Sequence, residues 1–167
     1  FAPVSKMIEL GVHVGIGTDG PASNNDLDMF EEIRLAAFIA KAVTGDPTTL
    51  PAETALIMAT RLGAQAIHLG DVTGSLEPGK RADLILVDIR PLHNAPRFHR
   101  DPHGLYSQLV YAGKSSDVTD VMVNGRWVMR DRALLTLNEA ELLAQATDYA
   151  RQIDTFLIQR EQSVLSK

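Results

Sequence analysis

The sequence predicts an α/β fold, and three observations indicate it. Residues 12–17 alternate apolar side chains with small or polar ones, which is the period-2 pattern of a strand. Residues 27–43 carry apolar side chains at helical spacing and predict a long helix. Farther along, two apolar runs flank an Asn-Gly pair at 124–125, the strongest short signal of a β-hairpin. Helices and strands therefore alternate first, and a β-rich part follows.

Length and composition exclude several classes of protein. With 167 residues, 45% of them hydrophobic, the chain can bury a core, but a complete (β/α)8 barrel needs roughly 200–250 residues. The net charge of −5 and the pI near 5.5 argue against nucleic-acid binding. Cys is absent, so any metal must be bound by His, Asp, Glu or water. No apolar run reaches 18 residues, and we expect a cytoplasmic protein without membrane contact.

The first seventy residues read as helix, strand and further helices. The strand 12–17 runs into Gly17-Thr-Asp-Gly20, where small residues allow a sharp turn. Asn25 or Asp26 is expected to cap the long helix, and Pro51 to start the next one. The expected helices are 4–10, 27–43, Pro51 to Leu62-Gly63, and 64–69. The chain begins with Phe1 rather than Met, so we expect it to start inside a larger reading frame.

After residue 70 the pattern changes to turns and strands. We expect a turn at 74–79, a strand at 82–87, a surface loop at 89–106, strands at 118–123 and 126–129, and a helix at 139–162 capped by Asn138. Trp127 and the apolar stripe of the last helix are expected in the core. The predicted units are residues 1–70, 71–137 and 138–167.

Asp19 is the candidate site residue. It stands at the carboxyl end of a predicted buried strand, where α/β proteins place their chemistry, and Thr18 and Ser23 add polar groups nearby. From the residues alone, a plain turn or cap residue is the favoured interpretation of Asp19, because Asp is common in Gly-rich turns. Asp83, beside the turn at 74–79, is expected to be a structural hydrogen-bond acceptor.

The histidines form no recognisable metal motif. None occurs as His-x-His or His-Glu-x-x-His. His99 and His103 are four residues apart, but Pro102 between them opposes a helical ligand pair. His13 is expected to be an interior or interface residue, and His68 to be structural.

Two segments carry a family resemblance. Residues 15–34, GIGTDGPASNNDLDMFEEIR, and residues 74–88, GSLEPGKRADLILVD, resemble the amidohydrolase superfamily, in particular its aminohydrolase and chlorohydrolase branch. Residues 51–56, 109–112 and 121–126 fit that branch as well. The resemblance covers about residues 1–155.

The resemblance implies the C-terminal portion of a metal-dependent hydrolase: the last part of a (β/α)8 barrel, part of a small β-sandwich and a terminal helix. Asp19 matches the aspartate after the last barrel strand, which binds a divalent metal, zinc first and iron second, and helps to activate water. The implied reaction is hydrolytic deamination of an adenosine-like or other heteroaromatic amine, of the 5-methylthioadenosine or S-adenosylhomocysteine type. Residues 23–28 would line the rim of the pocket.

The chain also departs from that pattern. The family's His-x-His, its other His ligands and its proton-shuttling Glu would all lie upstream of Phe1. One carboxylate does not hold a catalytic zinc, so we expect a fragment that is inactive alone and exposes apolar surface and an open sheet edge. We expect a homo-oligomer or association with the missing barrel portion. Two alternatives stay open: a non-catalytic interaction module, and chlorohydrolase-type activity when another chain completes the barrel.

Overall fold

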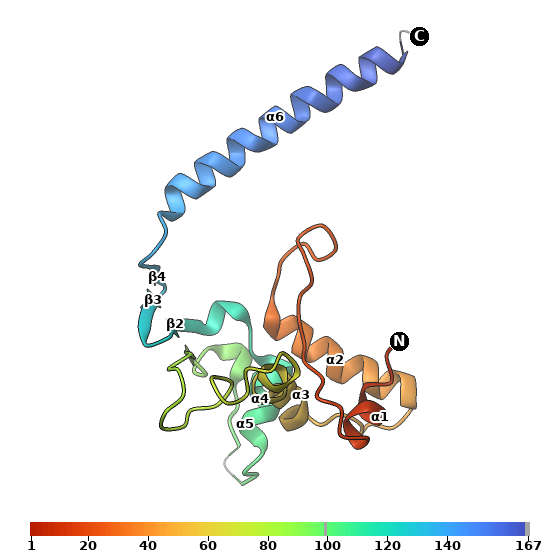
Figure 1. The fold of residues 1–167 in the computed structure, drawn as a ribbon, viewed down its shortest axis with the longest axis vertical. Coiled ribbons are helices and arrows are strands. Elements are labelled where there is room, and N and C mark those ends of the chain that lie inside the picture. The colour runs from red at the N-terminus through yellow and green to blue at the C-terminus, as the bar shows by residue number, and fades with distance from the viewer. Residues whose placement is uncertain (99, 166–167) are drawn as a thin grey trace.

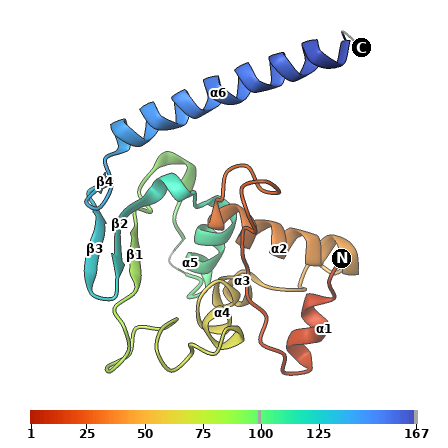
Figure 2. The ribbon, with the colours of Figure 1, turned by 45° about the horizontal axis from the view of Figure 1, so that its top comes forward.

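The computed structural model describes residues 1–98 and 100–165. Helices α2 to α5 pack together beside one antiparallel sheet, and a last long helix leaves the sheet and extends away from the body (Figures 1 and 2). The elements are α1 (Val4–Glu9), α2 (Met29–Thr44), α3 (Ala52–Met58), α4 (Arg61–Ala66), β1 (Leu84–Val87), the 3₁₀ turn η1 (Leu92–Asn94), α5 (Gly104–Ser107), the π-helical turn η2 (Gln108–Ala112), the 3₁₀ turn η3 (Ser115–Asp117), β2 (Val118–Val123), β3 (Arg126–Arg130), β4 (Ala133–Leu134) and α6 (Glu139–Leu165).

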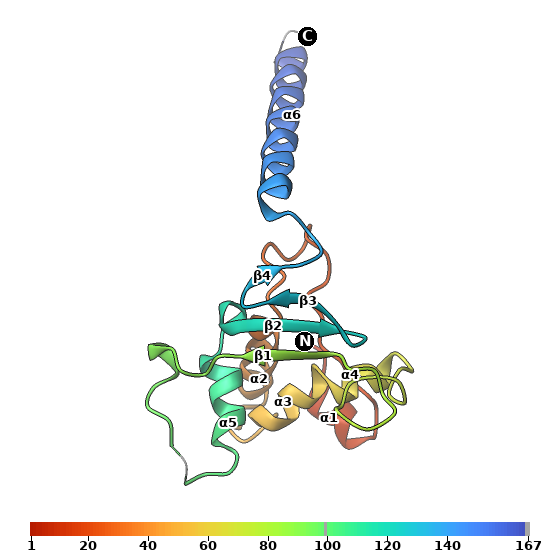
Figure 3. The same cartoon turned by 90° about the vertical axis from the view of Figure 1, so that its left-hand side faces the viewer.

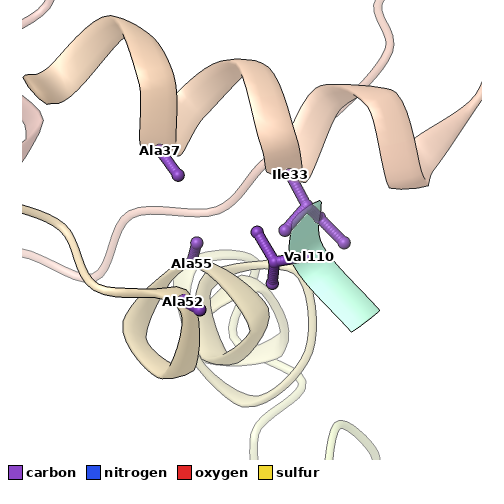
Figure 4. Packing of buried hydrophobic residues seen from close by; sticks show 5 residues of the cluster. All are labelled: Ile33, Ala37, Ala52, Ala55 and Val110. Atoms are coloured by element: carbon purple, nitrogen blue, oxygen red, sulfur yellow. The ribbon is translucent and has the colours of Figure 1, made fainter. Parts of the chain in front are cut away.

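The core joins α2 to α3 and η2. Ala37 and Ala55 are fully buried, so the two helices approach closely, and Val110 of η2 closes the space beside them (Figure 4). Ile16, in the segment before Asp19, packs against the same cluster. The core therefore anchors the segment that leads to the candidate site.

The sheet is a meander in the order β1-β2-β3-β4, with every neighbouring pair antiparallel (Figure 3). Asn124 and Gly125 have φ of 49° and 75°, so both turn residues lie in the left-handed region that a type I′ turn requires. The hairpin prediction is confirmed. β3 runs one residue past the expected end, and β4 was not expected.

The predicted strand at 12–17 is wrong in this structure. The segment is irregular, and no other strand pairs with it in the described part of the chain. A strand exists only through its ladder of hydrogen bonds to a neighbour, and alternation of side chains cannot supply that neighbour. His13 is exposed here, so of its two expected positions the interior one is wrong, and the interface one stays a prediction.

The long helix is confirmed, with a different cap. Asp28, and not Asn25 or Asp26, accepts hydrogen bonds from the amides of Phe30 (2.8 Å) and Glu31 (3.3 Å). Gly45, with φ of 69°, ends the helix in the left-handed region.

The helix expected from Pro51 to Leu62-Gly63 is divided at Thr60. Thr60 has φ of −127° and ψ of −97°, outside the helical region, and its hydroxyl donates to the carbonyl of Leu56 at 2.9 Å. Such back-bonding favours a bend. The third helix expected at 64–69 is in fact the second half of α4, and Ile67 follows as its cap.

Burial at the C-terminal end differs most from expectation. None of the described residues of α6 is buried, so the stripe expected in the core is solvent-exposed: Leu142 43%, Leu143 68%, Tyr149 64%, Ile153 58%, Phe156 59% and Leu157 47%. Trp127 is half-buried rather than in the core, with the Arg130 guanidinium 5.5 Å from its ring centre. Asn138 does cap α6, accepting from the Glu141 amide at 3.3 Å.

The loop expected at 89–106 contains short helical turns and a buried residue. η1 lies within it, α5 begins at its end, and the side chain of Asn94 is buried. Hydrogen bonds made by this loop, described below, hold Asn94 inside.

Candidate functional site

Asp19 lies at the tip of the segment that follows Ile16. Its carboxylate is exposed, and its φ of 58° is unusual for a residue with a Cβ. The approach to it is tight, because a Cβ on Gly15 would lie 3.1 Å from the Cα of Gly63 in α4. The glycine of the motif thus lets the segment pass close to the helix before it turns at Asp19.

The turn after Asp19 is closed by its own hydrogen bonds. The amides of Ser23 and Asn24 both donate to the carbonyl of Gly20, at 3.0 and 2.9 Å. The Ser23 hydroxyl donates to Asp19 Oδ2 at 2.8 Å. The expectation that Ser23 adds a polar group beside Asp19 is confirmed, whereas the Thr18 hydroxyl reaches only the Asp19 main-chain oxygen, at 3.2 Å.

The far end of this loop is held by α2 and by a distant serine. Asn24 donates from its side chain to Glu32 Oε1 on α2, and the Ser115 hydroxyl donates to Asp28 Oδ2 at 2.7 Å. Burial raises the pKa of Asp28, but the hydrogen bonds from Ser115 and the two helix amides outweigh it and hold the pKa below its ordinary value. Asp28 is thus an anionic anchor for the loop.

The sequence patterns above identify neither Asp28 nor Ser115 as part of this contact. Asp28 could have been found, because Asp followed three residues later by Glu is a capping signature. Ser115 could not, because it is 87 positions from Asp28 and no local pattern links them.

The other polar residues singled out in the sequence lie elsewhere. Asp83 accepts from the Thr73 hydroxyl (2.6 Å) and the Asn124 amide (2.6 Å), which confirms its structural role. His93 contacts Asp117 at 2.8 Å, and His103 pairs with Glu53 at 3.1 Å. His68 is exposed just after α4, and His99 lies outside the described residues.

The donor set around Asp19 tests whether these residues fit a metal. Among residues 1–98 and 100–165 there is no group of three or more His, Asp or Glu side chains placed to hold an ion. A zinc site needs about three protein ligands. Asp19 therefore fits a single carboxylate ligand, and the described residues do not form a complete centre.

A groove lies between the Gly15–Ile16 segment, α3–α4 and β1. Its lining is mostly apolar, with Asp83, Ser75 and two threonines as polar residues, and Asp19 is not part of it. The candidate site and this groove are separate features.

Comparison with known proteins identifies the chain. The amidohydrolase family matches residues 1–128, most of the chain. The chain belongs to the amidohydrolase family. The resemblance seen in the sequence is thereby confirmed.

Three relatives show how much of an amidohydrolase is present. The 5-methylthioadenosine/S-adenosylhomocysteine deaminase of Moorella thermoacetica is 51% identical over 87% of this chain and 33% of its own length. A zinc-bound adenosine deaminase from Xanthomonas campestris is 44% identical, with a TM-score of 0.86 over 93% of this chain and 34% of its own. The zinc-bound atrazine chlorohydrolase of Arthrobacter aurescens is 28% identical, with a TM-score of 0.77 over 89% of this chain and 32% of its own.

The chain thus spans about a third of the length of the relatives it matches. The predicted fold class is confirmed to that extent: a mixed α/β chain that superposes on part of these enzymes. Within the described residues, the structure has no helix with the length and apolar character that a membrane span requires.

Proposed function

We propose that this chain is part of a metal-dependent aminohydrolase that deaminates an adenosine-like or other heteroaromatic amine, of the 5-methylthioadenosine or S-adenosylhomocysteine type. The observation that carries the proposal is the superposition of 93% of the chain on a zinc-bound adenosine deaminase at 44% identity. The 51% identity to the Moorella enzyme supports this choice of substrate type.

In this proposal Asp19 is both a metal ligand and a catalytic residue. A carboxylate at an exposed loop tip, held by the neighbouring Ser23, has the chemistry of one oxygen ligand. Zinc is the first choice because two zinc-bound enzymes superpose on the chain, and iron is the second. In this proposal the other metal ligands come from residues other than those that the structure describes, because the described residues contain no group that could hold a metal ion.

The proposal also covers how the chain divides into structural units. Residues 1–70 would belong to the barrel, residues 71–137 to the composite β-sandwich and residues 138–167 to the terminal helix. The exposed apolar side chains of α2, among them Phe38 (49%) and Val43 (57%), support contact with further barrel elements or with another subunit. A cytoplasmic location stays a prediction.

A chlorohydrolase activity is the second candidate. The superposition on atrazine chlorohydrolase supports it, but with 28% identity against 44% for the deaminase. Deamination is therefore the reaction that we favour.

A chimaera tests the proposal. The aligned stretch of the Moorella deaminase is replaced by this chain, and ammonia release from 5-methylthioadenosine and bound zinc are measured. We expect a zinc-containing deaminase. Asp19→Asn should lower both zinc affinity and kcat/KM by more than about 100-fold, since even residues behind metal ligands cost about 10- to 100-fold.

Asp71→Asn is the matched control, because Asp71 is an exposed acid without a recorded side-chain partner in the described structure. Unchanged zinc binding and unchanged deaminase activity in the Asp19→Asn chimaera would show that Asp19 is neither a metal ligand nor a catalytic residue. Hydrolysis of a chlorotriazine without deamination would favour the second candidate instead.

A further inference from the structure

The Ser23 hydroxyl has two acceptors within reach and one proton to donate. Asp19 Oδ2 lies at 2.8 Å and the Gly20 carbonyl at 3.1 Å. A hydrogen bond to an ionised carboxylate is shorter and roughly twice as strong as one to a neutral carbonyl. The Ser23 hydroxyl therefore donates mainly to Asp19 Oδ2, and the Gly20 carbonyl is the weaker acceptor.

Ser23 itself is held in place from the helix side. Its amide and that of Asn24 are bound to the Gly20 carbonyl, which closes the turn. The Asn24 side chain donates to Glu32, one turn into α2, and accepts from the amide of Leu27 at 3.2 Å. The position of the hydroxyl is thus fixed by backbone geometry and by a helix that packs in the core.

Asp19 needs such support. It is exposed, so packing against other residues does not restrict its side chain. In the described structure, Ser23 is the side chain recorded as donating to its carboxylate. Donation to Oδ2 reduces the free rotation of the carboxylate and leaves Oδ1 as the oxygen available to a ligand.

We propose that Ser23 is a positioning residue that orients the Asp19 carboxylate for its ligand. Polar groups behind a metal-binding carboxylate fix its direction and are worth about 10- to 100-fold in metal affinity or activity. This inference rests on the proposed function, since it assigns to Ser23 a role at the same site.

The first test needs no metal. In the 167-residue chain, three-bond couplings to the Asp19 β-protons report whether one χ1 rotamer is populated. We expect a single rotamer in the parent and in Ser23→Thr, which keeps the hydroxyl, and averaged couplings in Ser23→Ala. Identical couplings in all three proteins would overturn the proposal whatever the chimaera does.

The second test uses the chimaera described above, with zinc affinity measured by chelator competition and kcat and KM measured separately. We expect Ser23→Ala to weaken zinc binding by about 10-fold and to lower kcat with KM unchanged, and Ser23→Thr to restore both. Ser116→Ala is the control, because Ser116 is exposed and no hydrogen bond of its hydroxyl is recorded.

A raised KM with unchanged zinc affinity would show that Ser23 contacts the substrate, and would overturn the positioning role. If the parent chimaera binds no zinc and is inactive, the proposed function fails, while the coupling measurement still decides whether Ser23 orients Asp19.

Discussion

At the scale of single residues, the buried carboxylate of Asp117 joins three parts of the chain. It is 2% exposed, and its Oδ2 atom accepts from His93 Nε2 (2.8 Å), the Lys114 amide (3.0 Å) and Asn94 Nδ2 (3.3 Å). Its main-chain oxygen accepts from the Asp88 amide at 2.8 Å. These contacts explain why Asn94 is buried inside a segment whose composition suggested a surface loop.

The Asp117 carboxylate predicts a loss of stability in acid. Burial raises its pKa, but the hydrogen bonds from His93, Lys114 and Asn94 outweigh burial and hold the pKa below the ordinary 3.8. A lowered folded-state pKa stabilises the protein above pH 3.8, and this contribution is lost as the pH falls through the folded-state value. Asp117→Asn should therefore flatten the fall in unfolding temperature as the pH drops below 3.8, as followed by circular dichroism.

The same substitution should also destabilise the protein at neutral pH, by about 1–3 kcal/mol, because buried donors lose a charged acceptor. Asp71→Asn serves again as the control and should leave the pH profile unchanged. A profile for Asp117→Asn that parallels the parent would show that another group governs acid unfolding.

At the scale of elements, α2 and α6 show how differently two amphipathic helices can be used. α2 buries Ile33 and Ala37 in the core and is tied to the η2 region by Arg34, whose Nε donates to the Val110 carbonyl at 3.2 Å. α6 is longer and extends away from the body (Figures 1 and 3). None of its described side chains is buried. An apolar stripe predicts that a helix has an inner face, and the partner for that face depends on the rest of the fold.

Removal of α6 should leave the body of this chain intact. A chain ending at Leu137 should unfold in urea with the same midpoint as the parent, because α6 contributes no buried side chain among the described residues. Ile33→Ala is the contrast, and should cost about 2–5 kcal/mol through the cavity left in the core cluster of α2, α3 and η2. A clearly lower midpoint for the shortened chain would show that α6 packs on the body in solution.

At the scale of the whole molecule, the chain contains only part of the site that we propose. Asp19, its turn and its anchor to α2 are present, yet the described residues contain no group of three or more acids or histidines that could hold a metal ion. The length of the matched relatives, about three times that of this chain, is in keeping with ligands supplied by other parts of an amidohydrolase.

The purified chain should therefore bind zinc poorly by itself. We expect well below one ion per chain by atomic absorption after dialysis, since a stable site takes about three protein ligands. The zinc-loaded chimaera is the positive control. Stoichiometric zinc in the chain alone would mean that its own residues complete a centre.

Features that depend on residues close together in the chain could be predicted from the sequence. The Asn124-Gly125 hairpin, the end of α2 at Gly45 and the Asn138 cap of α6 were all predictable. In each, the deciding interaction joins residues within about four positions, so local chemistry specifies it. Asp19 could be singled out for the same reason, because its Gly-rich turn is a local motif.

Which strand pairs with another strand, and which apolar face becomes buried, depends on contacts that only the folded structure shows. Residues 12–17 alternate like a strand but pair with no strand in the described structure, and the stripe of α6 has the spacing of a buried face but stays exposed. Ser115 reaches Asp28 across 87 positions, and Asp117 reaches His93 across 24. Pairing and burial are set by neighbours that are distant in sequence, so periodicity shows that a face exists and only the assembled fold shows what covers it.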